Sequence, residues 1–360
     1  MSLLFEPLSL GAVTVRNRVW VSPMCQYSAV DGVPHDWHLV HLGARAIGGA
    51  GLVMTEASAV SPEGRISPQD AGIWDDVQAE QWQRITAFLR SQGATSAVQL
   101  AHAGRKASSH RPWDTDSGVV ATEDGGWQPV GASAVAYEGL AVPTELDAAG
   151  IAKVRADFVA AARRSVDAGF DVLELHAAHG YLLHSFLSPL SNLRTDGYGG
   201  SFEGRTRLLL EVTEDVRAAV EAPLLVRISA TDWAEGGWDV EESVELARLL
   251  VDRGVELVDV SSGGNVAHQQ ITVGPGYQVP FAAAVRKTGV KTAAVGMITE
   301  PRQAEQVLTD GHADAVLLAR ESLRDPNWPL RAAAELGASV TWPPQYDRAH
   351  FRRPAAAGQR

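Results

Sequence analysis

FDVLELHAAHGYLLHSF, residues 170–186, is the stretch that decides how the chain folds. Its first part, FDVLELH, is a short and largely apolar run that stops at a histidine, which is typical of a strand covered on both faces. Other runs of the same kind are spread along the sequence: 17–23, 51–57, 95–101, 223–229, 256–262, 290–296 and 313–319. Together they predict eight buried strands.

Amphipathic segments separate these runs. Three of them have a clear helical period and end at a glycine, which favours a helix terminus: 76–93, 147–169 and 239–254. Eight strands that alternate with helices predict a (β/α)₈ TIM barrel, with a doubly wound open sheet as the alternative. We expect one domain over residues 1–360, in which 343–360 form a C-terminal tail with little regular structure.

The connection after the third strand is far longer than usual. From Lys106 to Asp147 the chain has no helical period and is rich in Gly, Pro, Ser and Trp. Trp113, Trp127 and Tyr137 should need burial, so we expect a lid-like insertion over the site. The alternative is a disordered insertion.

Composition excludes several classes of function. The net charge of −12 argues against general binding to nucleic acid or to a membrane surface. Cys25 is the only cysteine, so the chain cannot form an internal disulfide, a thiolate-rich zinc site or a four-cysteine iron–sulfur cluster. The N-terminus does not resemble a signal peptide, and no apolar run reaches the ~18 residues of a membrane span. We expect a cytoplasmic protein.

The carboxyl ends of the strands are where such a barrel places its chemistry. His176 closes the fourth strand, and His179 and Tyr181 follow in the next turn. These side chains could bind zinc, with His102 and Glu56 as further ligands. They could instead be two neutral imidazoles that donate to a developing oxyanion, with the phenol as the acid. Histidines satisfied within the core are the third interpretation.

Other strand ends favour a planar, anionic, phosphate-bearing cofactor. Gly296 and Arg320 close the seventh and eighth strands, where this fold usually binds phosphate. The amide of Gln99 can pair in both directions with a ring imide, and Arg227 directs a cation at the barrel mouth. Turn glycines and a surface arginine are the alternative to a phosphate site.

Four stretches carry a family resemblance that covers essentially the whole chain. SPMCQYS (22–28), QLAHAGRK (99–106), HAAHGYLLHSFLSPLSNLRTDGYGGS (176–201) and LLARESLRDPNWP (317–329) resemble the Old Yellow Enzyme family of FMN-dependent NAD(P)H ene-reductases. Within it, the chain is similar to the bacterial subclass with a cysteine beside the flavin. Three positions depart from the family pattern: Gln26, Gly204 and Ala319, the last within the phosphate clamp.

The resemblance implies a role for particular residues. Those implied to bind FMN are Ser22, Pro23, Met24, Cys25, Ala57, Gln99, Arg227, Gly296, Ala319 and Arg320. His176 and His179 would bind the substrate carbonyl oxygen, Tyr181 would protonate the α-carbon, and Tyr27 would be a second substrate contact. No metal is implied.

The implied reaction is ping-pong. NAD(P)H would reduce the flavin, and hydride would pass from flavin N5 to the C=C bond of an α,β-unsaturated ketone, aldehyde or imide. Lys106, His110 and Arg111 could bind the 2′-phosphate of NADPH, although NADH remains open as the reductant. The rivals are a metal-dependent barrel lyase or hydrolase and a flavin-binding barrel without catalysis.

The resemblance also implies an assembly. In the similar subclass, an arginine of a neighbouring subunit's C-terminal tail reaches the site, and QYDRAH places Arg348 at that position. We therefore expect a homodimer, or a homotetramer built from dimers. Tyr346 and Phe351 would anchor the tail.

Overall fold

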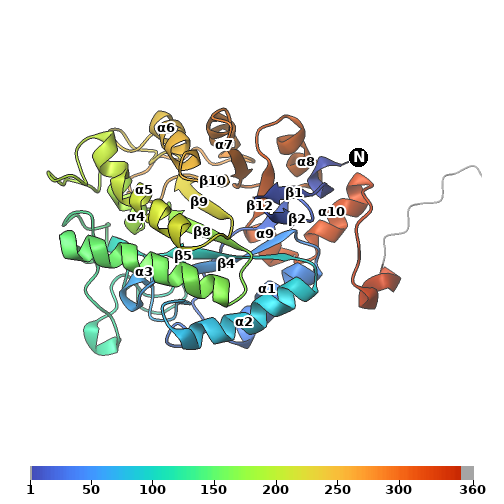
Figure 1. The fold of residues 1–360 in the computed structure, drawn as a ribbon, viewed down its shortest axis with the longest axis horizontal. Helices are drawn as coiled ribbons and strands as arrows, with labels where there is room; N and C mark the ends of the chain where they lie inside the picture. Colours follow the sequence, from blue (N-terminus) through green and yellow to red (C-terminus); the bar gives the residue numbers. More distant parts are fainter. Residues whose placement is uncertain (1, 350–360) are drawn as a thin grey trace, which may run out of the picture.

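A computed structural model of the protein describes residues 2–349 and shows a closed barrel of eight parallel strands (Figure 1). In chain order the barrel strands are β3 (Val19–Val21), β4 (Leu52–Ala59), β5 (Thr95–Ala101), β8 (Val172–Ala177), β9 (Leu224–Ser229), β10 (Leu257–Ser261), β11 (Lys291–Ala294) and β12 (Ala315–Leu318). Pairing of Val19 with Val316 and of Val21 with Leu318 closes the ring. The predicted barrel is confirmed, and the open-sheet alternative is wrong.

Helices cover the outside of the barrel. They are α1 (Asp36–Ile47), α2 (Asp76–Ser91), α3 (Ala148–Asp167), α4 (Leu182–Leu187), α5 (Phe202–Ala219), α6 (Val240–Val251), α7 (Val279–Arg286), α8 (Pro301–Thr309), α9 (Arg320–Arg324) and α10 (Trp328–Leu336). Side-chain caps begin several of them; Asp239 accepts from the Glu242 N–H at 2.9 Å, a contact of ~1 kcal/mol. Over residues 2–349, none of the helices has the length and apolar character needed to cross a membrane.

The inward side chains change character along each strand. Because successive residues point to opposite faces, every second residue of a strand faces the barrel interior. On β8, Val172 lies in the apolar cluster at the bottom of the barrel, Glu174 is buried at mid-height, and His176 lies at the mouth. The same order holds for Leu225, Arg227 and Ser229 of β9 and for Leu257, Asp259 and Ser261 of β10. The interior therefore becomes polar toward the carboxyl ends.

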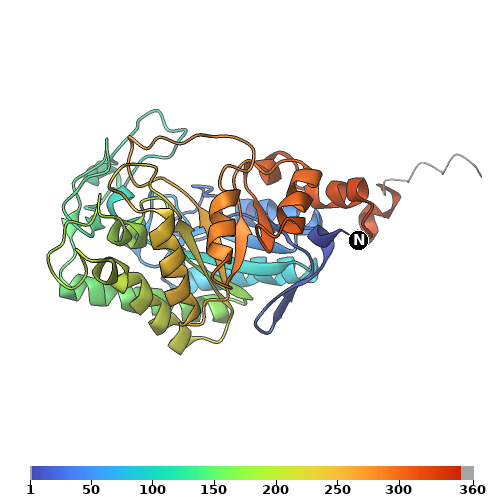
Figure 2. The same ribbon diagram turned by 90° about the horizontal axis from the view of Figure 1, so that it is seen from above.

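An N-terminal hairpin, which the sequence analysis missed, seals the bottom. Strands β1 (Leu8–Leu10) and β2 (Val13–Val15) pair antiparallel around Gly11, whose φ is +49°. Leu10 is fully buried and belongs to the same apolar cluster as Trp20 of β3. Figure 2 shows this hairpin and the insertion after β5 at opposite ends of the molecule.

The insertion over residues 107–146 is ordered, so the disordered alternative is wrong. It contains the 3₁₀ turn η4 (Thr122–Asp124) and a short parallel pair, β6 (Val130–Gly131) with β7 (Thr144–Glu145). Trp127 packs inward, and its indole N–H donates to the Glu63 carbonyl at 2.9 Å. The expectation for Trp113 was wrong: this side chain is 59% exposed, with its ring edge-to-face against Tyr27.

Candidate active site

The turn after β8 brings the predicted histidines together. His176 is buried near the carboxyl end of β8, one residue before its last. His179 lies in the left-handed region with φ of +59°. The ring centroids are 5.2 Å apart, and His176 Nε2 is 3.5 Å from His179 Nδ1. Tyr181 precedes α4, with its ring edge-to-face against His176 at 4.9 Å. The expected convergence at the barrel mouth is present.

The surroundings fix the protonation of these three side chains. The Ala178 N–H donates to His176 Nδ1 at 3.2 Å, so the ring proton of His176 is on Nε2. Burial, and then the charge of Arg227, lower the pKa of both imidazoles well below the ordinary value, so they are neutral. Burial raises the pKa of Tyr181 well above its ordinary value, so the phenol keeps its proton. The cluster therefore offers neutral donors.

The zinc interpretation lacks further ligands. Glu56 lies 3.2 Å from His38, and His102 Nδ1 accepts the N–H of Gly104 at 3.0 Å. In the part of the chain that the structure describes, no three His, Cys, Asp or Glu side chains meet in an arrangement suited to a metal. His179 and Tyr181 are partly exposed, which also disfavours histidines satisfied within the core.

A polar layer lies beneath the histidines. Gln99 donates from Nε2 to Glu174 Oε1 at 2.8 Å, and its own Oε1 accepts no hydrogen bond from residues 2–349. Arg227 donates to Ser22 Oγ at 3.1 Å and lies 3.3 Å from Asp259. This layer therefore offers the amide oxygen of Gln99 as an acceptor and the guanidinium of Arg227 as a cation, both at the mouth of the barrel.

Strand β3 and the residues after it form one wall. Pro23, Met24, Cys25 and Tyr27 follow β3 and are partly buried. Burial, and then the nearby Asp70 and Glu56, raise the pKa of the Cys25 thiol well above its ordinary value, so it is not a thiolate. On β4, the register shifts between Met54 and Ala57, and Ala57 then pairs with Gln99. Such a bulge re-aims side chains beside a site.

The ends of β11 and β12 border a cavity of about 480 Å³. Gly296, Ala319 and Arg320, the residues named above for a phosphate site, all line it. Gly296 has φ of +119°, a backbone conformation that residues with a side chain rarely adopt, which favours glycine at this position. Arg320 is exposed, and its side chain forms no ion pair or hydrogen bond with any residue from 2 to 349. Its guanidinium is available to an anion.

Three cations named for the 2′-phosphate of NADPH are engaged elsewhere. Lys106 donates to the carbonyls of His179 and Gly264 at 2.9 and 3.0 Å, and burial lowers its pKa to about 8. Arg111 pairs with Asp114 at 2.8 Å, and His110 lies 3.7 Å from the same carboxylate. Lys106, which immediately precedes the insertion, thus joins the turn after β8 to the loop after β10.

Arg348 is not brought to this site within one chain. It lies exposed in η5 (Pro344–Ala349), which follows α10 and lies away from the insertion in both views (Figures 1 and 2). Phe351, Arg352, Arg353 and the rest of the expected tail lie outside the described residues.

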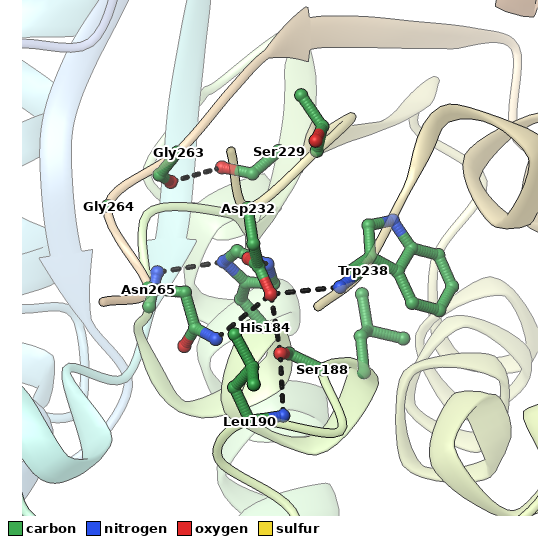
Figure 3. A network of polar contacts seen from close by, with 12 residues as sticks. His184, Ser188, Leu190, Ser229, Asp232, Trp238, Gly263, Gly264 and Asn265 are labelled. Carbon is green, nitrogen blue, oxygen red and sulfur yellow. Dashed lines mark hydrogen bonds and ion pairs between the residues drawn. The ribbon is translucent and has the colours of Figure 1, made fainter. Parts of the chain in front are cut away.

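Several buried polar residues near the site received no role from the sequence. His184 and Asp232 pair at 3.1 Å with both side chains fully buried (Figure 3). Glu174 and Asp259 are also fully buried. A carboxylate within an apolar strand, as in VLELHA and LVDVS, is the signal that could have pointed to the latter two.

Comparisons with known proteins identify relatives in both sequence and fold. The model of the NADH:flavin oxidoreductase / NADH oxidase family matches residues 3–338. An NADPH dehydrogenase of Bacillus licheniformis is 45% identical, over 96% of this chain and 98% of its own length. Among solved structures, morphinone reductase superposes with a TM-score of 0.79 at 30% identity, covering 94% of this chain and 91% of its own. An old yellow enzyme homologue from Zymomonas mobilis gives 0.77 at 28%, covering 97% and 99%.

The residues present fit the cofactor of that family. A cavity with an unpaired arginine suits a phosphate, and the Gln99 amide and the Arg227 cation suit the polar edge of an anionic ring. The chain belongs to the NADH:flavin oxidoreductase / NADH oxidase family, and it is an Old Yellow Enzyme-type oxidoreductase that uses FMN and NAD(P)H.

Proposed function

We propose that the protein is an ene-reductase, which reduces the C=C bond of α,β-unsaturated ketones, aldehydes or imides. One observation carries this proposal: two neutral imidazoles and a protonated phenol meet at the mouth of the barrel. Neutral ring N–H groups can bind a carbonyl oxygen and strengthen their hydrogen bonds as it gains negative charge. A phenol that keeps its proton can deliver it to carbon.

The FMN would be held along the barrel mouth. Arg320, Gly296 and Ala319 would bind its phosphate, and Gln99 and Arg227 would bind the polar edge of the ring. Ser22, Pro23, Met24, Cys25 and Ala57 would line the ring. When bound, this cofactor accepts hydride from NAD(P)H and returns it to the β-carbon of the alkene.

The remaining steps belong to this chain's own side chains. His176 and His179 would bind the substrate carbonyl oxygen and draw electron density from the β-carbon. Tyr181 would protonate the α-carbon, and Tyr27, in the same apolar cluster as Tyr181, would be a second substrate contact.

Cys25 supports placement in the subclass with a cysteine beside the flavin. Its thiol keeps its proton, so we assign it the tuning of the flavin reduction potential and not covalent attack.

The test is anaerobic oxidation of NADPH in the presence of 2-cyclohexenone, with the product identified. We expect cyclohexanone in a one-to-one ratio to NADPH consumed. A protein that retains FMN and is reduced by NADPH and by NADH, yet leaves every enone, enal and maleimide unchanged, would contradict the proposal and leave a flavin protein of another activity.

We further propose a homodimer, or a tetramer of dimers, in which Arg348 reaches the neighbour's site. Its exposure in η5, a segment that lies away from the insertion after β5 in both views, supports this. Two-fold symmetry makes the exchange reciprocal. Subunit exchange between a Tyr181→Phe chain and an Arg348→Ala chain should give activity above the average of the parents, because half the mixed sites hold both residues. Activity that stays at the average after demonstrated exchange would contradict the shared site.

A further inference from the structure

A histidine and an aspartate that the proposed reaction does not use are buried side by side next to the site (Figure 3). His184 lies on α4, and Asp232 lies in the loop after β9. His184 Nε2 is 3.1 Å from Asp232 Oδ1. The other carboxylate oxygen, Oδ2, accepts from Ser188 Oγ at 2.5 Å, from the Trp238 N–H at 3.0 Å and from Asn265 Nδ2 at 3.2 Å. Three donors therefore bind Oδ2, and His184 Nε2 is the ion-pair contact of Oδ1.

These donors keep Asp232 ionised although it is buried. Burial alone would raise its pKa, but the contact with His184, followed by the Ser188 hydroxyl and the Trp238 N–H, holds the pKa below its ordinary value. An ionised carboxylate can only accept hydrogen bonds. His184 must therefore present a proton on Nε2 to Asp232.

The other ring nitrogen of His184 holds the turn that carries His179. The Gly180 N–H donates to His184 Nδ1 at 2.8 Å. His179 and Gly180 are consecutive left-handed residues, with φ of +59° and +75°. At Gly180 a Cβ would lie 2.4 Å from the Gly264 carbonyl, so the turn is closely packed against the loop after β10. A left-handed histidine costs ~1–3 kcal/mol and persists only where its surroundings hold it.

Acceptance at Nδ1 depends on which nitrogen carries the proton. Because Asp232 requires the proton on Nε2, Nδ1 is left with a lone pair for Gly180. If the proton moved to Nδ1, two N–H groups would face each other and the turn would lose this hydrogen bond. The carboxylate thus acts on the turn through the tautomer of the imidazole between them.

We propose that His184 and Asp232 are positioning residues, which fix the left-handed turn at His179 and Gly180 and so aim the imidazole of His179 at the substrate oxygen. This inference rests on the proposed function. Asp232 contacts His184 at 3.1 Å, His184 accepts the N–H of Gly180 at 2.8 Å, and Gly180 is joined to His179 by the peptide bond between them.

Three variants distinguish an effect of the His184 tautomer on the turn from an effect of side-chain packing alone. Asp232→Asn can donate to Nε2, which drives the proton of His184 to Nδ1 against Gly180. His184→Gln keeps a group near Nε2 but removes the acceptor for Gly180. His184→Asn places an amide oxygen near Nδ1 and restores that acceptor, while Asp232 keeps its three other donors. Ser243→Ala is the matched control, because it removes a buried bond to Trp238 and does not touch the turn.

The measured quantity is the Kd of 4-nitrophenol for the oxidised, FMN-loaded enzyme. The absorbance of 4-nitrophenol itself shows whether it binds as the phenolate. The matched ligand 4-nitroanisole has the same ring and no ionisable oxygen. Asp232→Asn and His184→Gln should weaken phenolate binding about tenfold, the worth of one hydrogen bond to an anion, and leave 4-nitroanisole within about threefold. His184→Asn should bind both ligands like the unaltered protein.

The outcomes distinguish this inference from the proposed function. If His176→Ala weakens phenolate binding but Asp232→Asn behaves like Ser243→Ala, the positioning pair is wrong and the anion site stands. If His176→Ala also changes nothing, the proposed anion site itself fails. Should the Asp232 variant not fold, nitrogen-15 histidine spectra of the unaltered protein decide: a proton on Nδ1 of His184, assigned through His184→Asn, overturns the inference.

Discussion

At the bottom of the barrel, the hairpin β1–β2 buries leucine and valine side chains against Trp20, whereas at the mouth β8 delivers two histidines and a tyrosine on a left-handed turn. The bottom is held by apolar contact, which depends on volume and little on direction. The mouth is held by hydrogen bonds and charges, each of which requires one direction and one protonation state. A substitution at the bottom should therefore cost stability, and one at the mouth should cost function.

Tyr181→Phe should have the largest effect and should be confined to function. Loss of the proton donor should slow alkene reduction by about 10²–10⁴, while reduction of the flavin by NAD(P)H stays nearly unchanged. Stopped-flow timing of the two half-reactions measures this. Tyr198→Phe, whose hydroxyl donates to Glu211 away from the site, is the control. Equal slowing of both half-reactions would refute the role of Tyr181.

Leu10→Ala should show the opposite pattern. Removing this fully buried side chain should lower the free energy of unfolding by ~2–5 kcal/mol, because transfer and cavity costs add. Urea unfolding measures the loss, and both half-reactions should keep their rates at 25 °C. Thr14→Ala on the exposed face of β2 is the control. A change in the rate of alkene reduction without a change in stability would contradict the assignment of stability to the bottom of the barrel and of function to its mouth.

Arg320→Ala should affect the cofactor alone. Loss of a charge-assisted contact of ~1.5–3 kcal/mol should weaken FMN binding about tenfold to a hundredfold. Fluorescence titration of the apoprotein with FMN measures the constant. Arg302→Ala, on the exposed surface of α8, should bind FMN as before. Unchanged affinity in the Arg320 variant would remove this arginine from the phosphate site.

The smallest expected effect is that of pH on alkene reduction. The imidazoles have lowered pKa values and Tyr181 a raised one, so all three stay neutral. The rate should vary less than about threefold from about pH 6 to about pH 7.5, below the pKa of about 8 of Lys106. A fall in rate through the ordinary histidine pKa of 6.5 would contradict the neutral pair.

The same lowered pKa values make a prediction for stability. Below the ordinary value of 6.5 the unfolded chain takes up protons at His176 and His179, and the folded chain does not. The unfolded state then binds more protons, so the free energy of unfolding should fall as pH decreases through that value. Urea unfolding at a series of pH values checks the sign, and a rise in stability on acidification would contradict it.

The features that could be predicted from the sequence are those that depend on the residue pattern within a single segment. The run FDVLELH identified β8, and His176 and Arg320 were placed at strand ends because a parallel barrel gathers those ends at one face. The hairpin β1–β2 was missed because strands of three residues carry too few positions to show a period. The pairing of His184 with Asp232 joins residues 48 positions apart and follows only from the fold.

The error for Trp113 and the unforeseen contacts of Lys106 have the same physical origin. Trp113 was expected to be buried because of its apolar area, yet the insertion places it at the surface over Tyr27. Lys106 was named as a residue that could bind the 2′-phosphate because of its charge, and the structure shows it donating to the carbonyls of His179 and Gly264. Residue type gives the chemistry that a side chain can offer, and the neighbours that use it come from distant parts of the chain.

The pairing of β3 with β12 has a consequence for biosynthesis. Val19 finds its partner Val316 only after almost the entire chain has left the ribosome. Until that moment the nascent sheet carries two unpaired edges, which can add strands from other chains. Non-local pairing of this kind is also slow. The yield of native enzyme in a cell is therefore expected to depend on how long chaperones keep the open sheet apart from its neighbours, more than on the stability of the finished barrel.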